Sequence, residues 1–159
     1  MKILLIKFRN IGDVLLSTPL VNNLRHHYPS AKIDFCINKE TEAMLTLNPN
    51  LNEIYTYDRV NVKSLNSISR IREEVRFICF FKKQKYDIVI NLTNGDRGNL
   101  IAWWAKSPIR IGCLNKNWFF RKALTHQTPS QGLRHTVEVN LDPLRALNIP
   151  IANKKVEIF

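Results

Sequence analysis

Two short apolar runs constrain the fold of this chain more than any other feature. Residues 3–6 read Ile-Leu-Leu-Ile and residues 88–90 read Ile-Val-Ile, so neither run contains a polar residue. Continuous runs of this kind are typical of strands that are covered on both faces, because a strand with one face in water alternates apolar and polar residues. The runs therefore predict two central strands, over 2–8 and 86–93.

The segments between and after these runs alternate between strand and helix patterns. Alternating apolar residues predict further strands over 32–38, 53–57 and 109–113. Apolar residues at helical spacing predict helices over 14–27, 41–47, 65–81, 99–106 and 135–147. Strands that alternate with helices form a parallel sheet with right-handed crossovers. The predicted fold class is α/β, a Rossmann-like parallel sheet with helices on both faces.

Pro19 leaves the start of the first helix open. If Asp13 caps that helix, Pro19 falls inside it and should kink it. If Thr18 is the cap, Pro19 occupies the favoured first helical position. We expect an irregular first turn in either case.

The composition excludes several classes of protein. A length of 159 residues suits one ordinary domain. No stretch reaches the roughly 18 to 20 apolar residues of a membrane span, and the first apolar run lacks a cleavage site, so we expect a strand there and not a signal peptide. The three cysteines have no metal-ligand spacing, which argues against disulfides and zinc and fits a reducing cytoplasm. We expect no metal and no cofactor.

The charge indicates anionic partners. Lys and Arg number 24 against 13 acidic residues, which gives a net charge of +11. Nucleic acid, anionic lipid headgroups and phosphorylated substrates all fit this charge, and so does a basic protein without such partners. The charge alone does not choose among them.

The segment FRNIGD, residues 8–13, follows the first predicted strand. In a parallel sheet, ligands bind outside the carboxyl ends of the strands. Gly12 would let the backbone turn tightly, and Asp13 would stand at a helix N-terminus, where its charge is favoured. Asp13 could equally be only an N-cap. A dinucleotide site is not indicated, because GxGxxG is absent.

Other candidate residues also follow strands, and each has a simpler alternative. Arg9 and Asn10 could contact a substrate or be part of a solvated loop. Thr93, Asn94 and Asp96 follow the second central strand and could contact a substrate, or could form a turn whose side chains bond to nearby backbone.

Two further segments carry basic residues. Arg59 and Lys63 follow the third predicted strand, in what the pattern indicates is a loop. The segment NKNWFFRKALTH, residues 115–126, mixes aromatic and basic residues, so it could meet lipid headgroups or hold a lipid-linked acceptor. Its aromatic residues could equally pack into the core or against another domain. His135 and Glu138 lie three apart on the last predicted helix, and we assign them no metal.

Four pieces of the sequence carry a family resemblance. KILLIKFRNIGDVLLSTPLVNNLRHHYPSAKIDF contains the block GD-x-L-x-x-TP, and NPNLNEIY, KYDIVINLT and HTVEVNLDPLRALNIP follow it. Together they resemble the lipopolysaccharide core heptosyltransferases, glycosyltransferase family 9, and most of all the heptosyltransferase III subgroup. The resemblance extends over nearly all of the chain.

The resemblance implies both an architecture and a reaction. Family members have the GT-B fold of two Rossmann-like halves and transfer heptose from ADP-heptose with inversion. Residues 1–152 would be the amino-terminal, acceptor-binding half, and residues 153–159 would begin the connection to a carboxyl-terminal nucleotide-sugar domain. Asp13 would be the general base, and Arg59 and Lys63 would meet phosphates of the lipopolysaccharide core. This half alone would be inactive.

The resemblance also implies a location in the cytoplasm, peripheral to the inner membrane, with contact to anionic lipid and none to nucleic acid. The alternative from a different class is a non-catalytic basic module that binds nucleic acid or a protein partner. In such a module Asp13 would be dispensable.

Overall fold

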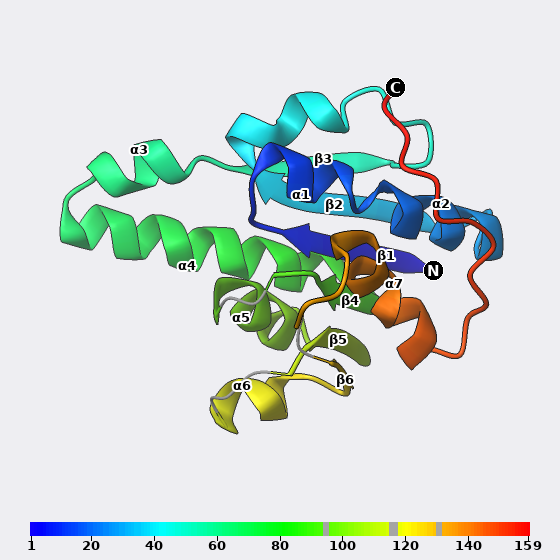
Figure 1. Ribbon diagram of the computed structural model, residues 1–159. Helices are drawn as coiled ribbons and strands as arrows, with labels where there is room; N and C mark the ends of the chain where they lie inside the picture. The colour runs from blue at the N-terminus through cyan, green and yellow to red at the C-terminus, as the bar shows by residue number, and fades with distance from the viewer. Residues whose placement is uncertain (94–95, 115–117, 130–131) are drawn as a thin grey trace.

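The computed structural model describes residues 1–93, 96–114, 118–129 and 132–159, without the side chains of residues 96, 119 and 121. Its centre is a parallel sheet of six strands in the order β3-β2-β1-β4-β5-β6 (Figure 1). The strands are β1 (Lys2–Lys7), β2 (Lys32–Asn38), β3 (Glu53–Tyr57), β4 (Ile88–Asn91), β5 (Ile109–Cys113) and β6 (His126–Thr128).

Helices cover both faces of the sheet, as the sequence predicts. One face carries α1 (Ile11–Leu15), α2 (Thr18–His27) and α7 (Thr136–Ala146). The other face carries α4 (Ser67–Gln84) and α5 (Asp96–Trp104), and α6 (Trp118–Ala123) lies beside α5. The predicted Rossmann-like α/β fold is therefore confirmed.

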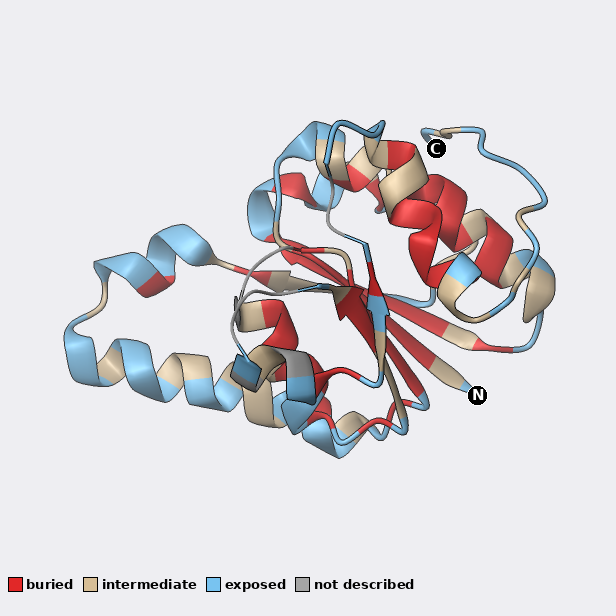
Figure 2. Ribbon diagram, turned by 60° about the horizontal axis from the view of Figure 1, so that its bottom comes forward, coloured by how far each residue is buried: buried red, intermediate tan, exposed pale blue. Residues whose placement is uncertain are grey.

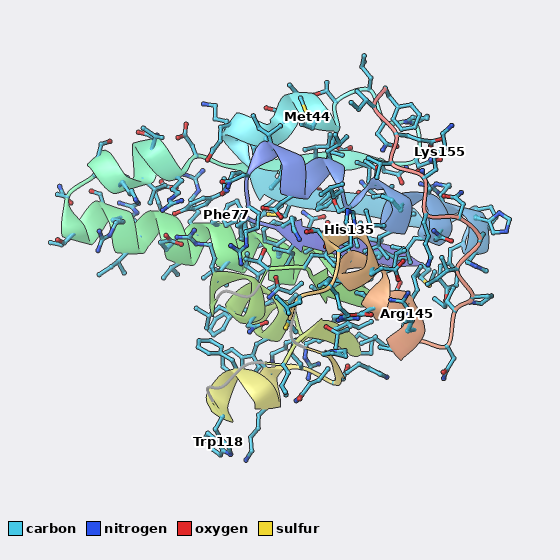
Figure 3. All side chains as sticks on the ribbon, viewed as in Figure 1. Met44, Phe77, Trp118, His135, Arg145 and Lys155 are labelled. Atoms are coloured by element: carbon cyan, nitrogen blue, oxygen red, sulfur yellow. The ribbon has the colours of Figure 1, made fainter. Side chains whose placement is uncertain are left out.

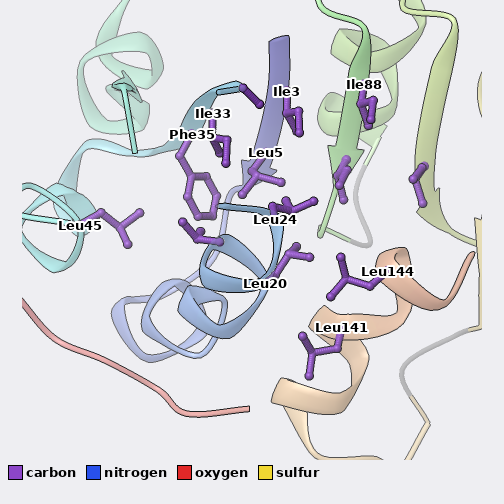
Figure 4. Packing of buried hydrophobic residues seen from close by; sticks show 14 of the residues in the cluster. Ile3, Leu5, Leu20, Leu24, Ile33, Phe35, Leu45, Ile88, Leu141 and Leu144 are labelled. Carbon is purple, nitrogen blue, oxygen red and sulfur yellow. The ribbon is translucent and has the colours of Figure 1, made fainter. Parts of the chain in front are cut away.

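The first apolar run supplies both layers of the core. Ile3 and Leu5 pack against the helices α2 and α7, among Leu24 and Leu141 (Figure 4). Leu4 and Ile6 point the other way and pack with Phe81 and Ile101 of α4 and α5. All four strand residues are 0% exposed. This two-sided burial explains why the run contains no polar residue.

The predicted first helix is two helices. The break falls at Ser17, which is the N-cap of α2, so that Thr18 is the first helical residue and Pro19 lies in the first turn. The expected irregular start is confirmed, whereas both candidate caps, Asp13 and Thr18, are wrong. Pro19 fits here because the amide hydrogen that it lacks would have no helical acceptor in the first turn.

The region after β3 differs from the predicted loop. Residues Arg59–Ser64 form the helix α3, because the Asp58 carboxylate accepts a hydrogen bond from the Asn61 amide at 2.9 Å and caps it. The helices α3 and α4 extend beyond the edge of the sheet, and most of α3 is exposed (Figures 1 and 2). The predicted helix over 41–47 is a 3₁₀ helix, η1 (Lys39–Met44).

In the described residues, no helix combines the length and apolar character that a membrane span requires.

The strand β6 and the helix α6 were not predicted, because both are short and lack a clear apolar period.

A buried polar contact joins β2 to the start of β4. The Tyr86 hydroxyl donates a hydrogen bond of 2.7 Å to Asp34 Oδ2, and both residues are buried. Asp34 Oδ1 has no hydrogen-bond partner within the described residues. Burial raises the pKa of Asp34, and the hydrogen bond from Tyr86 opposes that rise.

We expect Tyr86→Phe to lower the free energy of unfolding by about 1.5–3 kcal/mol at neutral pH, because the buried carboxylate loses its hydroxyl donor. Urea unfolding measures the change. Tyr28→Phe is the matched control, since Tyr28 packs against the core and its hydroxyl has no recorded partner in the described chain. Equal losses in the two variants would contradict this role of Tyr86.

Candidate functional site

The polar candidate residues lie where the strand order of the sheet reverses. The strand that follows β1 in the sequence, β2, pairs with one side of β1. The later strand β4 pairs with the other side of β1. The carboxyl ends of β1 and β4 are therefore neighbours at a topological switch point, the place where open α/β sheets bind ligands. The segment 8–13 follows β1, and residues 92–96 follow β4.

Asp13 lies in the first turn of α1 and is half-buried. The N-cap of α1 is Asn10, whose carbonyl accepts the Val14 amide at 3.1 Å, so Asp13 has no capping role there. Within the described part of the chain, its carboxylate accepts no hydrogen bond. The simple reading of Asp13 as an N-cap is therefore wrong, and its carboxylate is left without a recorded structural role.

The reason given for Gly12 is also wrong. Gly12 lies within α1 and does not have a positive φ angle, so the backbone makes no tight turn that needs glycine. A Cβ atom at this position would have no atom of the described chain within 4 Å. The fold therefore does not require glycine here, and the space above residue 12 is open.

Lys7 is a site residue that the sequence did not reveal. It ends β1 with 5% of its surface exposed, and its ammonium donates to the Leu92 carbonyl at 3.1 Å and to Asn140 Oδ1 at 2.9 Å. Burial lowers its pKa to about 8, the charge of Asp13 opposes the change, and that of Arg9 adds to it. The buried ammonium thus lies within electrostatic range of Asp13.

Asn140 connects this group to the helix layer. Its side-chain amide donates to the Leu16 carbonyl at 2.9 Å, between α1 and α2, while its oxygen accepts from Lys7. One side chain of α7 therefore fixes both the end of β1 and the segment that carries Asp13. A polar residue on an apolar helix face was the signal that could have identified it.

The candidates after β4 are described only in part. Thr93 is buried, and its hydroxyl accepts the Phe8 amide at 2.8 Å, while its own amide donates to Asn91 Oδ1 at 3.0 Å. Thr93 therefore holds the two strand ends together. Asn94 lies outside the described residues, and of Asp96 only the backbone, at the start of α5, is described.

Arg9 and Asn10 are both exposed. The Arg9 carbonyl accepts a hydrogen bond from Asn38 Nδ2 at 3.3 Å, which anchors the loop to the end of β2. Among the described residues, no contact of either side chain excludes the solvated-loop alternative.

Arg59 and Lys63 line a hollow of about 590 Å³ between α3 and α4. The structure adds two arginines to its wall that the sequence did not assign to a site, Arg70 from α4 and Arg97 from α5. Asp13 does not line this hollow or the other hollows recorded among the described residues. The basic candidates are thus brought together, but not around Asp13.

Arg97 is held in place in the wall of this hollow. Its guanidinium donates to both oxygens of Glu74, at 2.7 and 3.2 Å, and stacks 4.1 Å from the ring centre of Tyr57. Burial, together with the hydrogen bond to Glu74, raises the pKa of Tyr57 to about 12. The ring of Phe8 lies 5.9 Å from that of Tyr57, so this cluster adjoins the end of β1.

Of the remaining candidates, His135 and Glu138 have structural roles. His135 is the N-cap of α7 and accepts the Val137 amide at 3.3 Å. Glu138 pairs with Arg145 and with Lys154, the latter at 2.7 Å. In the segment 115–126, Trp118 is exposed, with the Lys122 ammonium 4.3 Å from its ring centre (Figure 3). Over the described residues, no cluster of His, Cys, Asp and Glu could hold a metal ion.

Comparison with known proteins supports the resemblance drawn from the motifs. No family model matches the chain. The chain is 32% identical to lipopolysaccharide heptosyltransferase 3 of Escherichia coli K12 over 141 residues, which are 87% of this chain and 40% of that protein. The chain therefore spans about 40% of the length of this relative.

Solved structures give the same result. A family 9 glycosyl transferase from Veillonella parvula DSM 2008 superposes with a TM-score of 0.78 at 29% identity, over 99% of this chain and 44% of that one. E. coli heptosyltransferase WaaC, solved with ADP-2-deoxy-2-fluoro heptose, gives a TM-score of 0.81 at 15% identity, over 99% of this chain and 51% of that one. The second likeness is one of fold alone.

The sheet order and its match to about half of each of these structures define the chain as a Rossmann-like half of the GT-B glycosyltransferase fold. The chain is a homologue of the lipopolysaccharide heptosyltransferases of glycosyltransferase family 9, as its motifs indicate. The comparisons do not favour the alternative of a non-catalytic basic module.

We expect Lys7→Met to change how stability depends on pH. The pKa of Lys7 falls from 10.5 to about 8 on folding, so between these values the unfolded chain binds a proton that the folded chain has released. Rising pH therefore favours the folded wild type in this window, by at most about 3 kcal/mol. In the variant this contribution is absent.

Urea unfolding of wild type and variant across that window measures the effect. Lys155→Met, which removes a side chain that is 77% exposed, is the control and should leave the pH dependence as it is in the wild type. A wild type and a Lys7→Met variant with parallel pH profiles would show that the buried ammonium does not titrate in this range.

Proposed function

We propose that this chain is the acceptor-binding half of an inverting glycosyltransferase that transfers heptose from ADP-heptose to the lipopolysaccharide inner core, as heptosyltransferase III enzymes do. The observation that carries the proposal is the Asp13 carboxylate, which lies at the switch point of the sheet and accepts no hydrogen bond within the described chain. The 32% identity to heptosyltransferase 3 supports the choice of reaction.

Asp13 would act as the general base. In an inverting transfer the acceptor hydroxyl attacks the anomeric carbon while ADP leaves from the opposite face. The hydroxyl must lose its proton as the new bond forms, so the base must come within about 2.6–3.2 Å of it. A carboxylate is a weak base and takes the proton late, when bonding to the sugar has already made the hydroxyl acidic.

The open space at Gly12 would suit the approach of the acceptor. A side chain at this position would stand beside Asp13, where the incoming sugar must fit. Lys7 would act from inside the protein, because its buried ammonium attracts the Asp13 carboxylate without being exposed to the acceptor. Arg9, Asn10, Thr93, Asn94 and Asp96 would line the approach to the same point.

The hollow with Arg59 and Lys63 would receive phosphates of the acceptor core. Its wall carries four cationic side chains against one carboxylate, that of Glu74, which is paired with Arg97, and this excess of positive charge favours an anionic ligand. The donor would be bound mostly by the part of the heptosyltransferases that this chain does not span, with residues 1–152 as the acceptor half and 153–159 as the start of the connection. The enzyme would work in the cytoplasm, peripheral to an anionic inner membrane.

We expect Asp13→Asn to reduce heptose transfer by about 10²- to 10⁴-fold, because the amide cannot accept the proton of the acceptor. The assay uses a chimeric protein in which this chain replaces the matching part of E. coli heptosyltransferase 3. Mass spectrometry of a truncated core acceptor measures the transfer, and circular dichroism checks the fold.

Asp87→Asn is the matched control. Asp87 lies before β4, at the opposite edge of the sheet, and is exposed. It should keep normal transfer. An Asp13→Asn chimera with the turnover of the wild-type chimera would refute the role of Asp13 as the base.

We expect Arg59→Gln with Lys63→Gln to weaken binding of a phosphorylated core oligosaccharide about tenfold or more, because two cations of the hollow are lost. A dephosphorylated oligosaccharide should bind the variant and the wild type alike. Calorimetry on the 159-residue chain measures both affinities. Lys32→Gln with Lys155→Gln removes the same charge elsewhere. If this control weakens binding equally, net charge and not the hollow binds the acceptor.

A further inference from the structure

The helix α4 carries an apolar stripe that faces water. Ile68, Ile71 and Val75 are spaced three and four residues apart, so they lie on one face of the helix. They are 83%, 62% and 53% exposed. A helix stripe of this kind normally faces a core. Here the core of α4 is built on Phe77 and Phe81 instead, so the stripe contributes little to the fold.

The stripe continues onto α5. Val75, Ile78 and Cys79 of α4 form a hollow of about 190 Å³ together with Leu100, Trp103 and Trp104 of α5. The two tryptophans are 43% and 37% exposed, and their ring centres are 5.6 Å apart. The apolar surface therefore runs along two neighbouring helices, which makes it larger than the scattered apolar residues of an ordinary surface.

Cations border the far end of this surface. The Lys82 ammonium lies 5.5 Å from the ring centre of Trp104. Lys82, Lys106 and Arg110 line a second hollow, of about 520 Å³, with both tryptophans. Tryptophan beside lysine and arginine is the arrangement found at the boundary between lipid headgroups and acyl chains, where the ring enters the apolar layer and the cation meets phosphate.

The near end of the surface adjoins the basic hollow of Arg59 and Lys63. Ile71, Val75 and Ile78 line that hollow as well as belonging to the stripe or to its continuation. The surface thus leads from a cationic hollow over aliphatic residues to tryptophans and further cations. An amphiphile with a phosphorylated sugar on an acyl anchor has the same order of chemistry.

We propose that the α4–α5 surface docks on the face of an anionic lipid bilayer. This surface consists of the apolar residues Ile68, Ile71, Val75, Trp103 and Trp104 and the cations Lys82, Lys106 and Arg110. The inference rests on the proposed function in that the acceptor would be lipid-anchored in the same bilayer. The net charge of +11 adds a long-range attraction to anionic lipid.

Charge and shape favour a bilayer over other occupants. Single-stranded nucleic acid binds by stacking its bases on aromatic rings, and the isoleucines of α4 offer no such ring. The last segment of the chain packs elsewhere: Ile149, Ile151 and Val156 lie against the core on the α2 and α7 face of the sheet. A second copy of the chain would bring the same cations together, which opposes association.

Cosedimentation of the 159-residue chain with lipid vesicles tests the proposal, with no donor or acceptor present. We expect binding to vesicles that contain about 30% phosphatidylglycerol and much less to pure phosphatidylcholine, with a loss of affinity in high salt. Ile68→Gln with Ile71→Gln should weaken partitioning at least about tenfold, because two apolar side chains no longer enter the bilayer. Both positions are exposed, so the fold should persist.

Leu47→Gln with Leu133→Gln is the matched control, since both leucines are exposed and lie outside the surface. It should bind as the wild type does. In a Trp118→Phe background, quenching by brominated lipid reports on Trp103 and Trp104, and we expect the fluorescence of this variant to be quenched.

Any of the following results would overturn the proposal: equal partitioning of the isoleucine variant and the wild type, absence of quenching in the Trp118→Phe variant, or a dimer in light scattering that the isoleucine variant dissociates. Binding of an oligothymidylate that depends on the same isoleucines would overturn it in favour of nucleic acid. Vesicle binding and heptose transfer are measured separately, so failure of docking with transfer intact refutes the surface alone, and the reverse refutes the reaction alone.

Discussion

The burial of β1 on both faces is the constraint on which the rest of the structure depends. Ile3 and Leu5 anchor the layer of α2 and α7, while Leu4 and Ile6 anchor the layer of α4 and α5. A strand in this position must be central, with β2 on one side and β4 on the other. The strand order therefore reverses beside the carboxyl end of β1. The loop that follows β1 lies at this switch point as a direct consequence.

At the carboxyl end of β1, the apolar residues of the strand give way to a polar one, and this brings a charged group to the switch point. Lys7 is the last residue of β1, and its buried ammonium is satisfied by one backbone carbonyl from the end of β4 and one amide oxygen from α7. A buried cation with two acceptors is stable only when all three elements are in place. The Asp13 carboxylate, whose charge favours the protonated form of Lys7, accepts no hydrogen bond within the described residues.

Two regions of different chemistry follow from the way α3 and α4 extend beyond the sheet (Figure 1). Since most of α3 and the first half of α4 have no sheet to cover, many of their side chains are exposed. One side of the pair forms the cationic hollow around Arg97 and Glu74, and the adjoining side is the apolar α4–α5 surface. A sugar phosphate and a lipid surface are the partners that these two chemistries fit, and both belong to the proposed reaction at a membrane.

The sequence by itself determined the fold class, because continuous apolar runs and helical spacing report burial directly, and through the family motif it singled out Asp13 as the candidate base, which stays a prediction. It also located the strands over 32–38, 53–57 and 109–113 as the structure has them. Only the tertiary structure decided the roles of Lys7, Asn140 and Arg97, since a lysine at a strand end or an arginine after a turn looks like any solvated residue until distant elements surround it. Whether Arg59 lay in a loop or a helix, and whether the apolar residues of α4 faced a core or water, were likewise decided by contacts between elements, which local spacing does not encode.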